Sequence, residues 1–202
     1  KTEGINGNFD CVTYLDISTD PEEDGAEVYT DVKTAKEALG ATSPHAAALW
    51  PMGAVGDKIY YLSAMFAAMT AYTDAGNSDV PYESPSNKDL KITATVLKDG
   101  TEILLDQQQA NDLLNANGVI TAINANGYKA WGNNTAAYPS TTDPKDRWLA
   151  VRRFFDWDGN NFILTYFQKA DKPGNTRLIQ SIVDSQNIIG NGYVARDYCA
   201  GY

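Results

Sequence analysis

The beginning of the chain alternates between short strand-like stretches and stretches with helical periodicity, and this alternation constrains the fold more than any other feature. Residues 11–18 are rich in β-branched and aromatic side chains and predict a strand. Residues 30–40 predict a short helix, with Thr30 as its N-cap and Gly40 at its left-handed exit. Since this order usually places helices against parallel strands, the sequence predicts an α/β layer.

The alternation continues with a second strand and a second helix. Residues 45–53 predict a buried apolar strand, which Pro51 ends because proline has no backbone N–H to donate. From Leu62 to Met69, large apolar residues recur at helical spacing and predict a helix. Both elements extend the α/β pattern of the first strand and helix.

Later stretches predict further strands and helices. Residues 92–105 contain an Asp-Gly turn between two alternating runs and predict a hairpin. Residues 106–118 open with a capping box and predict a helix. Residues 119–124 predict a strand, and the stretch around Trp131 predicts another. The chain is therefore expected to be α/β, or α+β overall.

The last third of the chain predicts mainly helix. Residues 148–151 predict a strand that enters a helix over residues 152–169, and a final helix covers residues 178–189. The aromatic residues after 152 recur at helical spacing, which favours core packing over a base-stacking surface. Arg152 and Arg153 are adjacent and must point in different directions, so at least one should meet an acidic partner.

The turn-rich residues 138–146 mark the expected domain boundary. We therefore expect one domain over residues 1–142 and the first part of a second domain over residues 143–202. The chain begins with Lys1 and has no recognisable signal peptide, so a trimmed or partial chain is expected. Without a secretory context, the glycosylation pattern at Asn133 is interpreted as a chance match.

The charge of the chain excludes some classes of partner. The formal net charge is −10, which argues against nucleic acid and against an anionic membrane surface. The longest strongly apolar stretch, residues 60–72, is too short for a bilayer, which needs about 20 residues. Residues 1–40 are strongly acidic and residues 143–177 are mildly basic, so copies could meet head to tail. The alternative is a solvated acidic loop with ordinary surface lysines.

Catalytic and metal-binding motifs are poorly represented. His45 is the single histidine, and no nucleophile elbow, Walker loop or dinucleotide fingerprint occurs. Cys11 and Cys199 lie at opposite ends and are expected to be two buried thiols. One histidine and two distant cysteines argue against zinc, so we expect no enzyme, no cofactor and no metal.

Two alternative functions stay open: a hydrolase that would use His45, and a calcium-dependent binding module built on an acidic stretch. Asp20, Glu22 and Asp24 alternate, and Asp31 stands where an EF-hand loop places its last carboxylate. However, Pro21 is unsuited to such a loop, and a strand rather than a helix precedes it. A solvated acidic loop is therefore the favoured interpretation.

Several stretches together resemble a known family. They are residues 80–88, 113–124, 128–139, 151–157 and 178–198, in that order. In kind and spacing they resemble the contractile tail sheath proteins of myophages, prophages, R-type tailocins and related injection systems. The matching signature residues are Pro81, Ser84, Pro85 and Asn87 in a proline-serine-asparagine loop, then Trp131, Gly132 and Thr135, and then Arg152 and Arg153. Asn134 stands where the family usually has an arginine.

The resemblance implies a structural role. It implies a central, subtilisin-like α/β domain without protease function, followed here by the truncated start of an α+β domain. Sheath subunits polymerise helically around a tail tube and contract, so the implied partners are other copies, the tube protein and the baseplate. The implied location is the virion tail, assembled in the host cytoplasm, with neither nucleic acid nor membrane insertion. Lys169, Lys172 and Arg177 are our candidates for contact with the tube or a neighbouring copy.

Overall fold

The structure is a computed structural model that describes residues 9–201, except for the side chain at position 113. It contains a four-stranded sheet with the order β1-β2-β6-β7. The strands are β1 (Thr13–Asp16), β2 (Ala46–Leu49), β6 (Val119–Asn124) and β7 (Tyr128–Trp131). The pairs β1–β2 and β2–β6 are parallel, and β6–β7 is antiparallel. The predicted parallel α/β layer is therefore confirmed for the first three strands.

A second, smaller sheet follows the strand-ending proline. It has the order β4-β3-β5, with antiparallel pairing of β3 (Met52–Val55), β4 (Lys58–Tyr60) and β5 (Ala94–Val96). Pro51 follows the end of β2, as predicted, but the predicted strand over residues 45–53 is divided, because Met52 and Gly53 already belong to β3. The predicted hairpin is only partly formed, because β5 pairs mainly with β3 and meets the returning chain through one bridge to Glu102.

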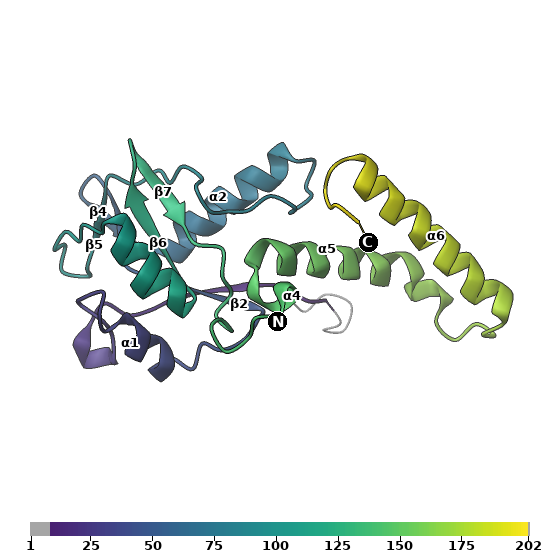
Figure 1. Ribbon diagram of the computed structural model, residues 1–202, viewed down its shortest axis with the longest axis horizontal. Helices are drawn as coiled ribbons and strands as arrows, with labels where there is room; N and C mark the ends of the chain where they lie inside the picture. Colours follow the sequence, from purple (N-terminus) through teal and green to yellow (C-terminus); the bar gives the residue numbers. More distant parts are fainter. Residues whose placement is uncertain (1–8, 202) are drawn as a thin grey trace.

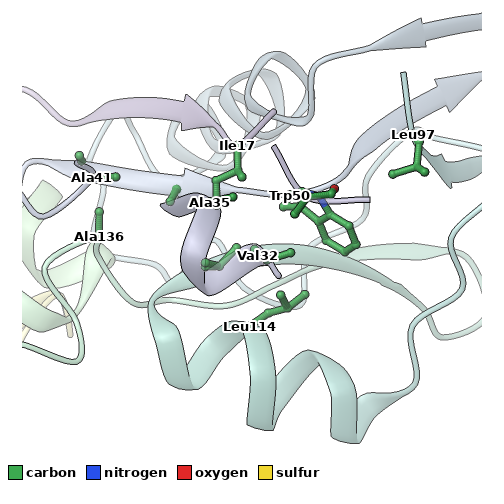
Figure 2. Close-up of a cluster of buried hydrophobic side chains, with 12 residues drawn as sticks. Ile17, Val32, Ala35, Ala41, Trp50, Leu97, Leu114 and Ala136 are labelled. Atoms are coloured by element: carbon green, nitrogen blue, oxygen red, sulfur yellow. The ribbon is translucent and has the colours of Figure 1, made fainter. Parts of the chain in front are cut away.

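Two buried clusters hold helices on opposite faces of the main sheet. Successive side chains of a strand point to opposite faces, and β2 follows this rule. Ala46, Ala48 and the following Trp50 belong to one cluster, whereas Ala47 and Leu49 belong to the other. The first cluster contains Val32 and Ala35 of α1 (Val32–Ala38), and Figure 2 shows them beside Trp50. The second contains Leu62, Phe66 and Met69 of α2 (Leu62–Gly76).

The helical stretch before β6 begins as predicted. Asp106 and Gln109 form the expected capping box of α3 (Gln107–Gln109), and the turns η3 (Ala110–Leu114) and η4 (Asn115–Asn117) continue it. The predicted N-cap of α1 is wrong by one residue: Asp31 occupies that position without capping the helix, and the Thr30 hydroxyl bonds to the Asp31 carboxylate instead. Gly40 has the predicted left-handed conformation.

Two long helices extend from the α/β part as a hairpin, which we call the arm (Figure 1). The arm consists of α5 (Leu149–Tyr166), the short turn η5 (Phe167–Lys169) and α6 (Thr176–Ala195), and α4 (Pro144–Arg147) precedes it. The predicted strand over residues 148–151 is wrong. Trp148 makes one bridge to Asn134 and is the N-cap of α5, which begins at Leu149. Within residues 9–201, no helix is long and apolar enough to cross a membrane.

Candidate assembly surface and its junction with the sheet

Both arginines of the predicted pair form ion pairs at the base of α5, and Arg153 fixes this helix to the α/β part. The Arg152 Nε atom donates to Asp156 Oδ1 at 3.0 Å, and its Nη1 lies 3.3 Å from Asp146 Oδ1. The Arg153 guanidinium donates to both carboxylate oxygens of Asp74, near the end of α2. The two arginines point to different acids, as expected from their adjacency. Leu149 adds an apolar anchor, because it is fully buried in the second cluster.

His45 also belongs to this junction. Its Nδ1 atom lies 3.2 Å from Asp156 Oδ2, which connects the start of β2 to α5. Asp156 is only 6% exposed. Burial raises the pKa of its carboxyl group, although the charges of Arg152 and His45 act in the opposite direction. Sequence reasoning missed this contact because the two residues are 111 positions apart.

The stretch from Trp131 to Thr135 connects β7 to the base of the arm. The Trp131 indole donates to Asn111 Oδ1 at 2.7 Å, and the Gly132 amide donates to Ser86 Oγ at 3.0 Å. The buried Thr135 hydroxyl donates to the carbonyl of Asp146. Gly132 has φ +131°, and a Cβ there would lie 2.6 Å from a side-chain oxygen. The backbone conformation and the lack of space both require glycine.

Asn134 binds a guanidinium from elsewhere in the chain. Its Oδ1 accepts from Arg147 Nε at 3.2 Å, and its amide nitrogen donates to the carbonyl of Asn115 at 2.9 Å. The Arg147 guanidinium lies 4.3 Å from the ring centre of Tyr138 and 4.2 Å from that of Trp148. Thus Arg147 places a positive charge beside the position that the resemblance assigns to an arginine.

The loop with the proline-serine-asparagine pattern is fixed against β7. The Asn87 amide donates to the carbonyl of Ala130 at 2.7 Å, and the Ala130 amide donates to the carbonyl of Lys88 at 2.9 Å. Pro81 and Pro85 are buried, and Ser84 accepts a hydrogen bond from the amide of Ser86. These contacts give a fixed loop, as the prolines predict.

A buried lysine of α1 connects that helix to the stretches that contain Asn117 and Tyr138. The Lys36 Nζ atom of α1 donates to the carbonyls of Asn117 and Tyr138, at 2.6 and 2.9 Å. Burial lowers the pKa of its ammonium group to about 8. Gly118, at φ +68°, leaves room for this side chain, since a Cβ there would lie 2.9 Å from Nζ and 2.4 Å from the carbonyl oxygen of Tyr138.

The arm exposes large apolar side chains along both of its helices. Ile179 and Ile188 of α6 are 59% and 73% exposed. The other exposed members are Phe155, Phe162, Leu164, Phe167, Val183 and Ile189, and we call all eight the arm patch. The predicted core packing of the α5 aromatics is therefore wrong for Phe155, Phe162 and Phe167. Phe155 and Phe162 line a cavity that they share with Gly190 and Tyr193 of α6, yet each of the three aromatics is at least 41% exposed within the described chain.

Aromatic contacts hold α6 against the base of α5 and not against the patch. The Tyr193 hydroxyl donates to Asp158 Oδ1 at 2.8 Å, and its ring lies 5.5 Å from that of Phe154. Burial is the main cause that raises the pKa of Tyr193 above its ordinary value. Beyond α6, Tyr198 stacks on Tyr82 at 4.6 Å between ring centres. These contacts close the hairpin near the sheet, between the first half of α5 and the end of α6.

The three basic candidates lie around the turn that joins the two helices of the arm, at the end remote from the sheets (Figure 1). Lys169 ends η5, Lys172 is in the turn and Arg177 is in the first turn of α6. All three are exposed, and none forms a salt bridge within the described part of the chain. Their charges are available to a partner.

The acidic calcium candidates serve local structure instead. Asp20 caps the short turn η2 (Pro21–Glu23) and lies 3.1 Å from Lys98, and this hydrogen bond lowers the pKa of its carboxyl group. Asp24 has a left-handed conformation, and Asp31 stands at the start of α1. Over residues 9–201, Asp20, Glu22, Asp24 and Asp31 do not form a group of ligands around one point.

The two cysteines differ from the prediction. Cys11 and Cys199 are free thiols as expected, but both are only half-buried. Cys11 precedes the edge strand β1, and Cys199 follows the end of α6, so neither lies within one of the two clusters.

Comparison with known proteins identifies one curated relative. The tail sheath protein of Burkholderia phage BcepMu is 29% identical over 150 residues, which are 72% of this chain and 30% of that protein. The chain thus spans less than a third of the length of this relative. A scan of protein-family models gives no match.

Solved structures share the fold at low sequence identity. The PVC sheath complex of an extracellular contractile injection system, in its contracted state, has a TM-score of 0.67 and 20% identity over 89% of this chain and 47% of its own. A chain of the anti-feeding prophage baseplate has a TM-score of 0.67 and 17% identity, over 90% of this chain and 44% of its own. A chain of the anti-feeding prophage helical sheath, in its contracted state, has a TM-score of 0.57 and 18% identity, over 79% of this chain and 50% of its own. The α+β fold is therefore shared, while its subtilisin-like character stays a prediction.

Proposed function

Because this chain is a member of the contractile tail sheath family, we propose that it is part of a structural subunit that polymerises helically around a tail tube. Contraction of that assembly drives the tube through a host envelope. The subunit does no chemistry of its own, and it acts in the virion tail after assembly in the bacterial host. The main observation that supports this role is the arm, whose eight exposed apolar residues suit contact with other protein surfaces.

The partners follow from the same role. Other copies of the subunit and the baseplate are the first partners, because assemblies of both kinds contain chains of this fold. The tail tube is the third. Lys169, Lys172 and Arg177 form an exposed basic group at the end of the arm that could meet the tube or an acidic neighbour.

Residues 1–142 form part of the central domain in this proposal, and residues 143–202 begin the next domain. The division falls at Asp143, whose side chain caps α4 directly before the arm. Trp131, Gly132 and Thr135 hold the end of the central domain, Arg153 fixes the arm to it, and Arg152 connects α4 to α5. The family residues are thus positioning residues and not catalytic ones.

The experiment is deletion of the gene from the bacterium or prophage that carries it, followed by electron microscopy of released particles. A sheath subunit predicts bare tubes without a striated outer layer. Particles with an intact sheath that still contracts would contradict the proposal. Complementation with the unmodified gene is the control for effects on neighbouring genes.

Charge reversal tests the basic group separately. We expect Lys169→Glu, Lys172→Glu and Arg177→Glu together to reduce the number of complete sheaths at least tenfold, because opposite charges steer and fix protein contacts. The control reverses Lys33 and Lys58, two exposed lysines of the α/β part. If sheath assembly and contraction are unchanged in the triple variant, these residues contact neither tube nor neighbour.

A further inference from the structure

Three potential metal ligands meet where the arm joins the sheet. Asp10 precedes β1, His45 precedes β2 and Asp156 lies on α5. One ligand atom from each of the three lies within 4.8 Å of the others. No motif relates these residues in sequence, and their meeting follows from the parallel pairing of β1 with β2 and from the position of α5 beside them.

The spacing of two of these atoms fits a metal site. His45 Nδ1 and Asp156 Oδ2 are 3.2 Å apart. In a tetrahedral zinc site with bonds of about 2.0–2.1 Å, ligand atoms are about 3.3 Å apart. The pair could therefore coordinate one ion with little movement. The Asp10 side chain is exposed and makes no salt bridge within residues 9–201, so its carboxylate is free to complete the set.

Neighbouring residues orient the candidate ligands. Arg152 Nε donates to Asp156 Oδ1, which leaves Oδ2 directed at the imidazole. The Asn160 side chain binds the backbone of Asp10 twice, by accepting from its amide at 3.0 Å and donating to its carbonyl at 2.8 Å. Metal ligands in proteins are commonly held by a second layer of hydrogen bonds of this kind.

The local negative charge and the openness of the cluster to solvent both favour the binding of a cation. Arg152 pairs with both Asp146 and Asp156, and Asp10 adds a third carboxylate beside Asp156, so the cluster has an excess of negative charge. The adjacent Arg153 is neutralised by its own partner, Asp74. Two surface cavities reach the cluster: Asp10 and Asp156 line one, and Asp10 and His45 line the other. An ion and its water could therefore enter from solvent.

We propose that Asp10, His45 and Asp156 bind a divalent transition-metal ion, with zinc as the best match and water in the fourth position. The imidazole nitrogen favours zinc over magnesium or calcium, which prefer oxygen ligands only. The ion would connect the beginnings of two adjacent strands to α5 and so fix the arm relative to the sheet. This inference does not depend on the role of the chain in a sheath.

Zinc titration of the protein by calorimetry, together with NMR of its single histidine, tests the site. We expect saturable binding of one zinc ion and a direct change in the signal of His45 Nδ1. At a free zinc concentration of 100 times Kd, the thermal midpoint should rise by about 5–10 °C. Saturable binding that leaves the His45 signal unchanged would overturn the proposal, and so would the absence of binding up to millimolar zinc.

Two variants and a control make the assignment specific. His45→Ala should abolish the zinc-dependent rise in the thermal midpoint. Asp10→Asn should weaken zinc binding at least tenfold while the metal-free midpoint stays unchanged, because this carboxylate is exposed. Asp184→Asn removes an exposed carboxylate of α6 and should bind zinc like the unmodified protein. Equal zinc affinity in the Asp10 variant and the control would rule out the three-ligand site.

Discussion

In the α/β part, Leu62 and Phe66 of α2 are fully buried against the sheet, whereas Ile179 and Ile188 of α6 are 59% and 73% exposed. Both helices have large apolar residues at helical spacing, so their sequences alone look similar. The difference lies in what covers them: α2 packs on a sheet of the same chain, whereas Ile179 and Ile188 remain mostly exposed among residues 9–201. The same pattern therefore forms a core in the α/β part and leaves large apolar side chains exposed in the arm.

The largest expected effect separates these two regions directly. Phe66→Ala should lower the free energy of unfolding by about 3–5 kcal/mol, because it leaves a cavity in the second cluster. Phe162→Ala, the same change in the arm patch, should lower it by less than about 1 kcal/mol because that ring is 41% exposed. Chemical denaturation of both variants measures the difference. Similar losses would mean that the arm is as well packed as the sheet.

A glycine substitution compares the junction with the far end of the arm. Gly132→Ala should cost about 2–4 kcal/mol, because the alanine would be strained at φ +131° and its Cβ would lie 3.2 Å from the backbone of Ile120. Gly174→Ala, in the turn of the arm, meets open space and should change the free energy of unfolding by less than about 0.5 kcal/mol. Thermal and chemical unfolding of the two variants measures this difference in stability. A Gly132→Ala variant as stable as the unmodified protein would contradict the expectation.

The smallest expected effect is a pH dependence in the α/β part. The folded pKa of Lys36, about 8, is below its ordinary value of 10.5, so the unfolded chain binds more protons at this side chain between these values. The contribution of Lys36 to the free energy of unfolding should therefore rise with pH across this window. We expect a rise of roughly 1–2 kcal/mol, because water partly screens the ammonium group.

The measurement is the difference in free energy of unfolding between the unmodified protein and Lys36→Met, from pH 7.5 to 10.5. Other titrating groups cancel in this difference. The matched control is the same measurement on Lys169→Met, which removes an exposed lysine of the arm. A flat difference for Lys36 would mean that its ammonium group is solvated in the folded protein.

The sequence predicted the local structure of the sheet well, because local signals determine it. The strand over residues 119–124, the capping box before it and the end of β2 at Pro51 each depend on a few neighbouring residues, and all are confirmed. The strand over 148–151 failed because the same apolar residues can start a helix, and the turn at Trp148 decided between them.

The sequence predicted the candidate sites less well than it predicted the sheet. Helical spacing groups aromatics along a helix but cannot show whether another element covers them, so Phe155, Phe162 and Phe167 were taken for core residues. The ring of His45 meets Asp156 only through the tertiary fold. Lys36 likewise looks like an ordinary helix-surface lysine until the carbonyls of Asn117 and Tyr138 approach it.

Over the described residues, the hydrogen bonds and buried contacts that join helix α5 to the α/β part lie between Leu149 and Asn160, and this has a mechanical consequence. Leu149 is fully buried at its start, and Phe162 is exposed more than three turns later. Eighteen residues form an α-helix about 27 Å long. A tilt of about 10° at the anchored end would move the other end by about 5 Å, the length of one helical turn. Because the start of α5 is buried in the core, a small change in the ion pairs there would move the far end of the helix by a much larger distance.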